Sequence, residues 1–292
     1  MDRKVSYGVA VSEEVLGERA SVPLQGGIAE GMATAAALGF ECVELHLRNP
    51  VEFDPKALAR LSAETAVRIA AIGTGLEYSL NGLSLTSDDP VVREKASRRM
   101  REHIDLAAHF GAVVFLGLIR GKCGSTALLP EYLDRLARQL APLAEYAAEK
   151  GAPTGLEPVA YYFSDLLNTT AETLEFLGRP GLGGIGVLLD THHIHLEDKD
   201  MEAAFRRCAG RITHVHLSDS NRRYPGAGNI DFRRVAQTLD GIGYAGAVSL
   251  EILPAPSGRE AARLGIAQMR ELWDSPHEAR RTASAAAERG RR

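Results

Sequence analysis

Short apolar runs alternate with amphipathic segments along almost the whole chain, and this alternation predicts a regular succession of strands and helices. The apolar runs are rich in Val, Ile and Leu and are typical of parallel strands that are buried on both faces. The predicted strands comprise residues 4–11, 42–47, 68–73, 112–119, 153–159, 184–190, 211–217 and 247–253. The predicted helices comprise residues 29–38, a segment that begins at Pro55, and residues 90–110, 130–150, 170–177, 201–208, 232–239 and 259–273.

Several of the predicted helices carry recognisable end signals. Asp54 precedes Pro55, which combines a capping side chain with a proline at the first helical position. Gly39 and Gly151 follow two other helical segments, as expected of glycine at a helix C-terminus. Thr169 is a candidate cap for the helix that follows it.

A single closed (β/α)₈ barrel of the TIM type, in the α/β class, is the fold that this alternation predicts. Eight strands and eight helices in strict alternation favour the barrel, whereas a doubly wound open sheet usually has fewer strands. The length of 292 residues suits one such barrel, which typically takes about 250 residues. We therefore expect residues 1–274 to form one catalytic domain.

The composition is that of an ordinary globular protein, with 45% hydrophobic and 25% charged residues. A net charge of −4 provides no basic surface, so we expect no nucleic acid partner. No long apolar segment precedes the first predicted strand, so we expect neither a signal peptide nor a membrane span. The three cysteines, Cys42, Cys123 and Cys208, are widely separated and odd in number, which favours reduced thiols in a cytoplasmic protein.

Four polar residues each close an apolar run near the end of a predicted strand: Glu157, Asp190, His216 and Glu251. In an α/β barrel the carboxyl ends of the strands meet at one face, where catalytic groups lie. Three carboxylates and an imidazole that converge there would repel one another unless a divalent cation neutralised them. If each were only structural, each would need its own buried partner. Oxygen-rich ligation with one imidazole suits Mn²⁺, Mg²⁺, Co²⁺ or Zn²⁺ and lacks the thiolates that would single out zinc.

Several motifs resemble the xylose isomerase-like barrel superfamily, and within it the sugar epimerase group that includes ketose 3-epimerases, hydroxypyruvate isomerase and inosose dehydratase. These motifs lie at residues 155–159 (GLEPV), 189–193 (LDTHH), 215–223 (VHLSDSNRR), 225–232 (PGAGNIDF) and 249–251 (SLE). The resemblance is strongest over residues 151–253 and weaker but compatible before them.

The resemblance implies a role for each matching residue. It implies that one divalent ion, Mn²⁺ first among the candidates, is bound by Glu157, Asp190, His216 and Glu251. It also implies that His193 and Arg222 contact the carbonyl of a sugar substrate or the neighbouring hydroxyl. Glu44 resembles the family's second-strand glutamate and is a further candidate for substrate binding. Glu44 and His46 alternate with apolar neighbours, and we expect one of them to point into the barrel mouth.

The chemistry of such an enzyme fits these residue types. Epimerising or isomerising a sugar beside a ketone requires removal of a carbon-bound proton and stabilisation of an enediolate. A metal and Arg222 would supply positive charge for the oxyanion. Glu157 and Glu251 lie at the two ends of the ligand arc and are the predicted acid–base pair, each worth about 10²–10⁴ in rate.

One departure from the ketose 3-epimerase pattern concerns the substrate. The family's second glutamate, which contacts terminal hydroxyls, aligns with Phe163, and Tyr161 lies nearby in the chain. We expect Tyr161 and Phe163 to line the pocket there and to make it less polar on that side. The candidate substrates are therefore a sugar acid, a deoxy sugar, a cyclitol or a glycoside as well as a free ketose.

Three other functions remain as alternatives. A lyase or dehydratase acting on a keto-cyclitol, keto-sugar or glycoside would use the same metal and the same proton abstraction, and would then expel a leaving group. An endonuclease for abasic DNA is disfavoured because Gly73, Thr74 and Gly75 end the third strand without a histidine. A non-catalytic binding subunit is disfavoured by the presence of both Glu157 and Glu251. A homo-oligomer, dimer or tetramer, is possible for any of these, but no segment indicates an interface. After the fourth strand, Arg120 and Lys122 form either an anion-binding loop or a solvated basic one.

The last residues, 275–292, consist mainly of Ala, Arg, Glu and Ser and have few large apolar side chains to bury. We expect a polar and flexible tail. Deleting residues 282–292 should therefore leave both the melting temperature and the activity unchanged. Thermal denaturation and steady-state kinetics of the shortened chain would check this, and a large loss in either would contradict it.

Overall fold

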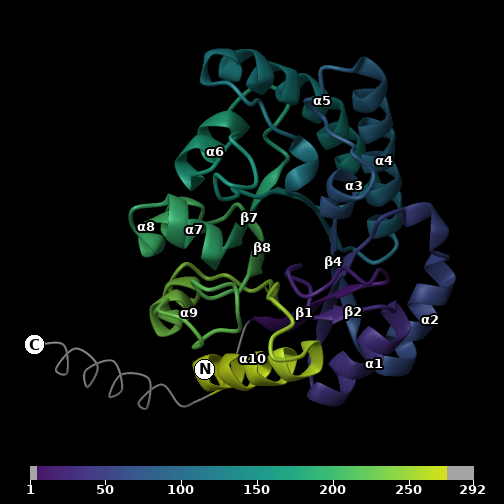
Figure 1. The fold of residues 1–292 in the computed structure, drawn as a ribbon, viewed down its shortest axis with the longest axis vertical. Helices are drawn as coiled ribbons and strands as arrows, with labels where there is room; N and C mark the ends of the chain where they lie inside the picture. The colour runs from purple at the N-terminus through teal and green to yellow at the C-terminus, as the bar shows by residue number, and fades with distance from the viewer. Residues whose placement is uncertain (1–4, 275–292) are drawn as a thin grey trace, which may run out of the picture.

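The computed structural model describes residues 5–274 and shows a closed barrel of parallel strands surrounded by helices (Figure 1). Each barrel strand pairs in parallel with the next one in the chain, and the pairing of the first with the last closes the barrel. The barrel strands are β1 (Ser6–Ser12), β3 (Cys42–His46), β4 (Arg68–Gly73), β5 (Val113–Leu116), β6 (Thr154–Leu156), β7 (Gly186–Asp190), β8 (Ile212–His216) and β9 (Ala247–Leu250). The predicted (β/α)₈ barrel is confirmed. A further two-residue strand, β2 (Leu24–Gln25), pairs with the end of β1.

A ring of helices covers the outside of the barrel, with α10 lying beside α1 to complete it (Figure 1). The main helices are α1 (Ile28–Leu38), α2 (Pro55–Thr65), α4 (Pro90–Ala108), α5 (Leu129–Lys150), α6 (Thr170–Leu177), α8 (Met201–Arg207), α9 (Phe232–Gly241) and α10 (Gly258–Trp273). Shorter helical turns are α3 (Gly75–Ser79), α7 (Thr191–Glu197) and the 3₁₀ turns η1 (Pro50–Glu52), η2 (Leu118–Arg120) and η3 (Thr126–Leu128). None of the helices in residues 5–274 is long and apolar enough to cross a bilayer.

The end signals read from the sequence act as expected. The Asp54 side chain accepts hydrogen bonds from two backbone N–H groups at the start of α2. Thr169 forms a reciprocal capping box with Glu172 at the start of α6. Gly39 and Gly151 end α1 and α5 in the left-handed conformation, which glycine adopts without a steric penalty.

Two differences from the predicted elements concern the catalytic face. The helix α7 begins directly after β7, and α3 begins one residue beyond β4; neither is long enough to show an amphipathic period in the sequence. The strands β5 and β6 are shorter than predicted because the apolar run continues into irregular backbone and the η2 turn. Apolar content alone does not mark where a buried strand ends, since the loops beyond these strands are also buried. The predicted tail, residues 275–292, lies outside the described residues.

The strand register brings the predicted ligands to one level of the barrel. Asp190, the last residue of β7, lies directly opposite His216, the last residue of β8. His216 in turn lies opposite Ser249, two residues before Glu251. Glu157 is the residue directly after β6, and its backbone N–H donates to the carbonyl of Leu116 in β5 at 3.1 Å. All four side chains therefore start at the carboxyl face of neighbouring strands.

Candidate metal centre and active site

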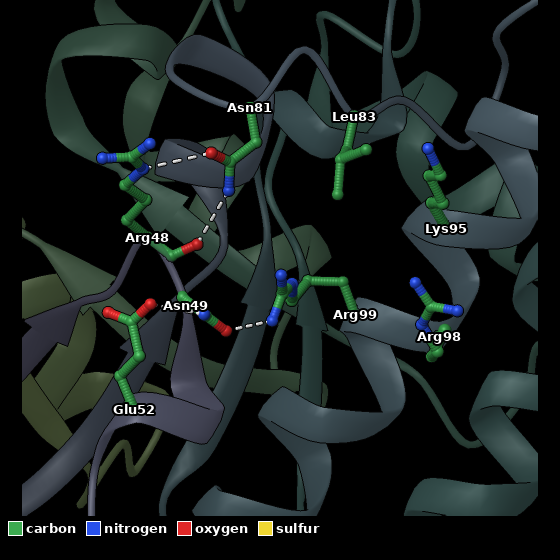
Figure 2. Close-up of a pocket in the computed structure, with 8 residues that line it drawn as sticks. All are labelled: Arg48, Asn49, Glu52, Asn81, Leu83, Lys95, Arg98 and Arg99. Carbon is green, nitrogen blue, oxygen red and sulfur yellow. Dashed lines mark hydrogen bonds between the residues drawn. The ribbon is translucent and has the colours of Figure 1, made fainter.

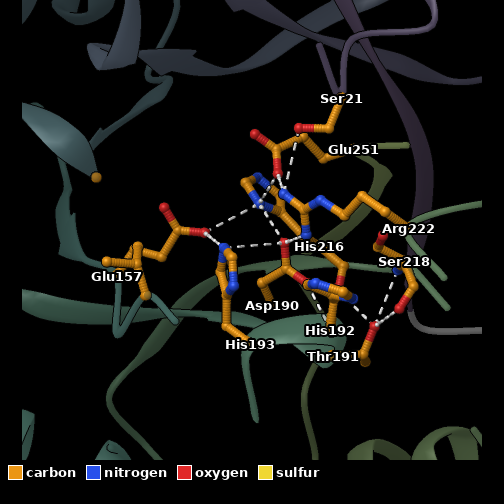
Figure 3. Close-up of polar contacts among 12 residues, drawn as sticks. Ser21, Glu157, Asp190, Thr191, His192, His193, His216, Ser218, Arg222 and Glu251 are labelled. Atoms are coloured by element: carbon orange, nitrogen blue, oxygen red, sulfur yellow. Dashed lines mark hydrogen bonds and ion pairs between the residues drawn. The ribbon is translucent and has the colours of Figure 1, made fainter. Parts of the chain in front are cut away.

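The structure brings the four predicted metal ligands together at the carboxyl face of the barrel (Figure 3). Each contributes one atom, and these atoms all lie within 4.8 Å of one another; we call Glu157, Asp190, His216 and Glu251 the ligand cluster. From His216 Nδ1, the distances are 3.5 Å to Glu157 Oε1, 3.7 Å to Asp190 Oδ2 and 3.5 Å to Glu251 Oε2. Ligand atoms about 2.1 Å from a common cation lie about 3 Å or more apart, so a slight contraction would let them share one ion.

The donor atoms also fit a cation chemically. All four residues of the ligand cluster are buried, and Asp190 and His216 are fully enclosed. Glu157 Oε1 and His216 Nδ1 are buried and have no hydrogen-bond partner among the described residues. Buried polar atoms are nearly always hydrogen-bonded, so two buried acceptors without a partner, close to each other, are typical of a cation-binding site. The set of three carboxylates and one imidazole suits a hard or borderline divalent ion.

Local backbone structure aims these side chains. Asp190 has two roles, because Oδ1 accepts the His192 N–H at 2.7 Å to cap α7 while Oδ2 faces the ligand cluster. Gly117, after β5, leaves room for Glu157, since a Cβ at that position would lie 2.9 Å from Glu157 Oε2. The Asp190 side chain cannot rotate away without losing its capping contact with His192.

Arg222 reaches into the ligand cluster from the loop after β8. Its guanidinium forms ion pairs with Asp190 and Glu251, and its Nη2 lies 3.3 Å from Ser21 Oγ (Figure 3). The backbone of Arg222 has a φ of 60°, an uncommon conformation for a residue other than glycine and one often found at functional sites.

Asp219 holds the loop that carries Arg222 in this shape. Its buried carboxylate accepts hydrogen bonds from the backbone N–H groups of Gly226 and Gly228 through Oδ2 and of Ile230 through Oδ1. Its backbone carbonyl accepts the Arg222 N–H at 2.8 Å. The strained position of Arg222 is therefore maintained by a network that is fully satisfied within the loop.

His193, on α7, lies at the edge of the ligand cluster. Its Nε2 is 4.0 Å from Glu157 Oε1 and 3.9 Å from Asp190 Oδ2, and its Nδ1 has no hydrogen-bond partner among residues 5–274. Burial lowers the pKa of His193 to about 4, so the ring is neutral near pH 7. A neutral imidazole at this place is able to donate a hydrogen bond to a sugar oxygen or accept one from a sugar hydroxyl.

The surroundings push the pKa values of the cluster residues apart. Burial raises the pKa of Glu251 to about 7, although Arg222 and His216 oppose the shift. For Asp190, burial also favours the neutral acid, but the charge of Arg222, together with the imidazoles of His193 and His216, outweighs it and holds the pKa well below its ordinary value. His216 is driven the other way: burial disfavours its charge, but Glu44 and Glu251 raise its pKa well above the usual range. A proton on His216 or Glu251 would compete with a cation for the same atoms.

Glu44 lies beneath the ligand cluster, two residues before the end of β3. It is fully buried, and imidazoles contact both its oxygens: His46 at 2.6 Å on Oε1, and His214 and His216 at 2.8 Å each on Oε2. Burial would raise the pKa of Glu44, but these three rings hold it well below its ordinary value. Glu44 and His46 both face the barrel interior, because residues two apart lie on one face of a strand. The expectation that one of them points into the barrel mouth is confirmed for His46. Of the two, His46 lines the pocket described below and Glu44 does not.

Arg120 is buried, so neither the predicted anion-binding loop nor the predicted solvated basic loop describes it. Its guanidinium donates to the carbonyls of Leu116, Gly117, Leu166 and Leu167. Burial lowers the pKa of Arg120 to about 10, which leaves it charged near neutral pH, and Glu157 favours that charge. Arg120 thus joins the loops after β5 and β6, which flank Glu157, and leaves no donor on the solvent side for an anion.

A cavity of about 220 Å³ opens over the ligand cluster and has one polar and one apolar side. The polar side is formed by Glu157, Glu251, Arg222, His193 and His46. The apolar side includes Leu76, Leu118, Val159 and Phe163. Phe163 lines the cavity as predicted, with its ring 5.6 Å from that of His193, whereas Tyr161 is 72% exposed and does not line it. The expectation for Tyr161 was wrong because its side chain turns outward, while its N–H bonds to Glu197.

A larger cavity of about 380 Å³ lies away from the ligand cluster, between η1, the segment after α3, and α4 (Figure 2). Four cationic side chains line it, but three already have acidic partners within 4.0 Å: Arg48 with Glu14, Arg98 with Glu102, and Arg99 with Glu77 and Glu102. Size does not identify the active site here, because none of the groups of candidate metal ligands in residues 5–274 lines this cavity.

The fold and the site together define an α/β barrel with an acidic, histidine-containing centre at its catalytic face. The chain belongs to the xylose isomerase-like TIM barrel family, whose model matches residues 32–272. It is 31% identical over 248 residues to the L-ribulose 3-epimerase of Mesorhizobium japonicum, covering 83% of this chain and 81% of that protein. The predicted family and its sugar epimerase group are confirmed.

Solved structures give the same result for the fold. An L-ribulose 3-epimerase superposes with a TM-score of 0.77 at 25% identity, over 97% of this chain and 98% of that one. A D-allulose 3-epimerase from Methylomonas sp. in complex with D-allulose superposes with a TM-score of 0.75 at 23% identity, over 93% of this chain and 98% of that one. At 23% identity the second likeness concerns the fold alone.

Some residues around the site were not singled out from the sequence. His214 faces the interior two residues before His216, and this spacing on one strand was a signal that both rings share a face. Asp219 and Ser21 have no comparable signal, because their positions depend on how two loops fold over the barrel mouth.

Metal binding should require the ligand cluster. We expect chelator-treated protein to bind one Mn²⁺ per chain, and Asp190→Asn to abolish this binding because the amide loses the negative charge that faces the ion. Binding should weaken as the pH falls below about 7, since the pKa values of His216 and Glu251 are raised and protons then compete with the ion. Isothermal titration at several pH values would measure both effects. Asp198→Asn, which alters the contact of the residue after α7 with Thr170, is the matched control and should bind Mn²⁺ like the wild type. An affinity for Mn²⁺ in Asp190→Asn equal to that of the wild type would contradict the assignment.

Proposed function

We propose that this chain is a metal-dependent sugar epimerase that moves a proton at the carbon beside a ketone. The observation that carries the proposal is the convergence of two buried glutamates, Glu157 and Glu251, on either side of the bare Nδ1 of His216. The relatives named as ketose 3-epimerases support the same reaction class. A dehydratase on this site has no comparable support among them.

The ligand cluster would hold the divalent ion, for which Mn²⁺ is the first candidate and Co²⁺, Mg²⁺ and Zn²⁺ are others. When bound, the ion supplies the positive charge that stabilises an oxyanion on the substrate. Arg222, fixed between Asp190 and Glu251, adds a second positive charge at the same place.

Glu157 and Glu251 act as the acid–base pair. They come from β6 and β9, so a substrate seated between them presents one face to each carboxylate. Proton removal by one and proton return by the other inverts the carbon. A pKa near neutrality lets Glu251 serve as either acid or base. His193, neutral and partly unpaired, orients the substrate by hydrogen bonding to an oxygen.

The substrate is a ketose or a related keto-sugar whose far end is less polar than in the ketose 3-epimerases. By the sequence resemblance, Phe163 stands where those enzymes have a glutamate. Phe163, Val159 and Leu118 all line the cavity. A hydroxyl turned toward this wall would lose its bonds to water without gaining a partner.

Proton exchange with solvent is the direct test of the reaction. We expect Mn²⁺-loaded protein to exchange deuterium from solvent into at least one ketose of a panel that includes L-ribulose and D-allulose, with an epimer as product. Glu157→Gln and Glu251→Gln should each lower the rate about 10²–10⁴-fold at matched metal occupancy, because neither amide takes up a proton. NMR would follow both exchange and product. Glu202→Gln, on the exposed side of α8, is the control. An unsaturated product without an epimer would indicate the lyase instead.

The apolar wall predicts a preference between substrates. We expect a 1-deoxy or 6-deoxy ketohexose to have a kcat/KM about tenfold above that of its parent sugar. The parent sugar would bury a hydroxyl without a hydrogen-bond partner against the apolar wall, which costs about this factor. Phe163→Gln restores a hydrogen-bonding group and should reverse the preference. Steady-state kinetics on the matched sugar pairs would measure it. A wild-type enzyme that favours the parent sugars would show that Phe163 does not face the substrate.

A further inference from the structure

A buried polar layer lies directly below the ligand cluster and is organised around Glu44. Its Oε2 lies 2.8 Å from Nε2 of both His214 and His216, and its Oε1 lies 2.6 Å from Nε2 of His46. Glu44 is fully buried, and the three imidazoles are at most 5% exposed. Water therefore cannot hydrogen-bond to these side chains, and their polar atoms need partners within the protein.

The contact between Glu44 and His216 determines which nitrogen of His216 carries the proton. A carboxylate accepts hydrogen bonds and does not donate them, so Nε2 of His216 must be the N–H. In a neutral ring the lone pair then lies on Nδ1. That atom faces Glu157 Oε1 and Glu251 Oε2, at 3.5 Å from each, and has no hydrogen-bond partner among residues 5–274.

The ring plane of His216 is also constrained from the side. Phe115 packs edge-on against His216, with ring centroids 5.2 Å apart and an interplanar angle of 82°. The same phenyl ring packs against His46 at 5.7 Å. Ser249 Oγ lies 3.1 Å from His214 Nε2 and so anchors the second ring that shares the Glu44 oxygen. The imidazole is therefore held at one edge by a carboxylate and on one side by an aromatic ring.

We propose that Glu44 is a positioning residue of the metal centre: it fixes the tautomer and orientation of His216 so that Nδ1 is presented to the ion. This inference rests on the proposed metal-dependent function, and it assigns Glu44 a place behind a ligand instead of contact with the substrate. Carboxylates that orient a ligating histidine also increase its basicity, and their loss typically weakens metal binding about 10–100-fold. His46, which is bound to the other oxygen of Glu44 and lines the pocket, is oriented by the same carboxylate.

The chain provides a matched pair of buried glutamates for the test. Glu77, on α3, is also fully buried and contacts a histidine, His103, together with Arg99, but it is not part of the ligand cluster. We expect the dissociation constant for Mn²⁺, measured by competition with a fluorescent chelator, to rise about 10–100-fold in Glu44→Leu, which removes both acceptors. Glu44→Gln keeps one acceptor oxygen and should lie between Glu44→Leu and the wild type. Glu77→Gln should remain within about twofold of the wild type.

A second readout separates positioning from a purely structural role. In long-range ¹H–¹⁵N spectra of Mg²⁺-loaded protein, the wild type should show His216 with a proton on Nε2 and none on Nδ1. Loss of a structural residue would lower the melting temperature without changing this tautomer, whereas Glu44→Gln should change the His216 signals. Should Glu44→Leu fail to fold, the Gln variant and these spectra still decide the question.

The outcomes distinguish the two proposals. Wild-type affinity for Mn²⁺ in Glu44→Gln, together with unchanged His216 signals, would overturn the role of Glu44 and leave the metal centre in place. A wild-type chain that binds no Mn²⁺ would instead remove the metal centre, and with it both proposals.

Discussion

The convergence of three carboxylates on one buried imidazole, that of His216, is the constraint on which the rest of the site depends. Glu157, Asp190 and Glu251 come from separate strands, and closure of the parallel barrel forces their side chains into one buried space. Like charges at such distances repel strongly where water is excluded. The surrounding structure therefore supplies positive charge from several directions.

The charge-balancing groups are rigidly held by the backbone. Arg222 pairs with two of the carboxylates, in a loop organised by the backbone hydrogen bonds of Asp219. Arg120 holds its charge near Glu157 by bonding only to carbonyl oxygens. Such groups do not need to reorganise when charge develops on a substrate, which is the condition under which electrostatic stabilisation of a reaction is most effective.

Below the ligands, the barrel interior is polar where most α/β barrels are filled with branched apolar residues. Glu44 and its three histidines replace part of that apolar filling with a hydrogen-bonded layer. Burying these groups is favourable only because each imidazole N–H meets a carboxylate oxygen. Above the ligands, by contrast, Phe163 and its apolar neighbours define a wall that distinguishes this cavity from a uniformly polar sugar pocket.

The sequence by itself determined the barrel, the order of its eight strands and main helices, and which four residues meet in the ligand cluster. Apolar strand segments, helix caps and a polar residue at the end of an apolar run can all be recognised from local sequence. In a closed barrel of parallel strands the carboxyl ends of the strands meet at one face, so polar residues at those ends form a shared site. Thr169 and Asp54 act as caps because the contacts they make lie within three residues.

Only the tertiary structure decided the roles of residues whose partners are distant in the chain. Glu44 is separated from His216 by 172 positions, so no local pattern indicates that its carboxylate lies behind that ring. Arg120 is buried because two separate loops supply its acceptors, one of which, Leu166, lies 46 positions away in the chain. Tyr161 turns outward, whereas Phe163 turns into the cavity. Side-chain direction in irregular segments depends on packing between segments, and hydrophobic periodicity carries no information about it.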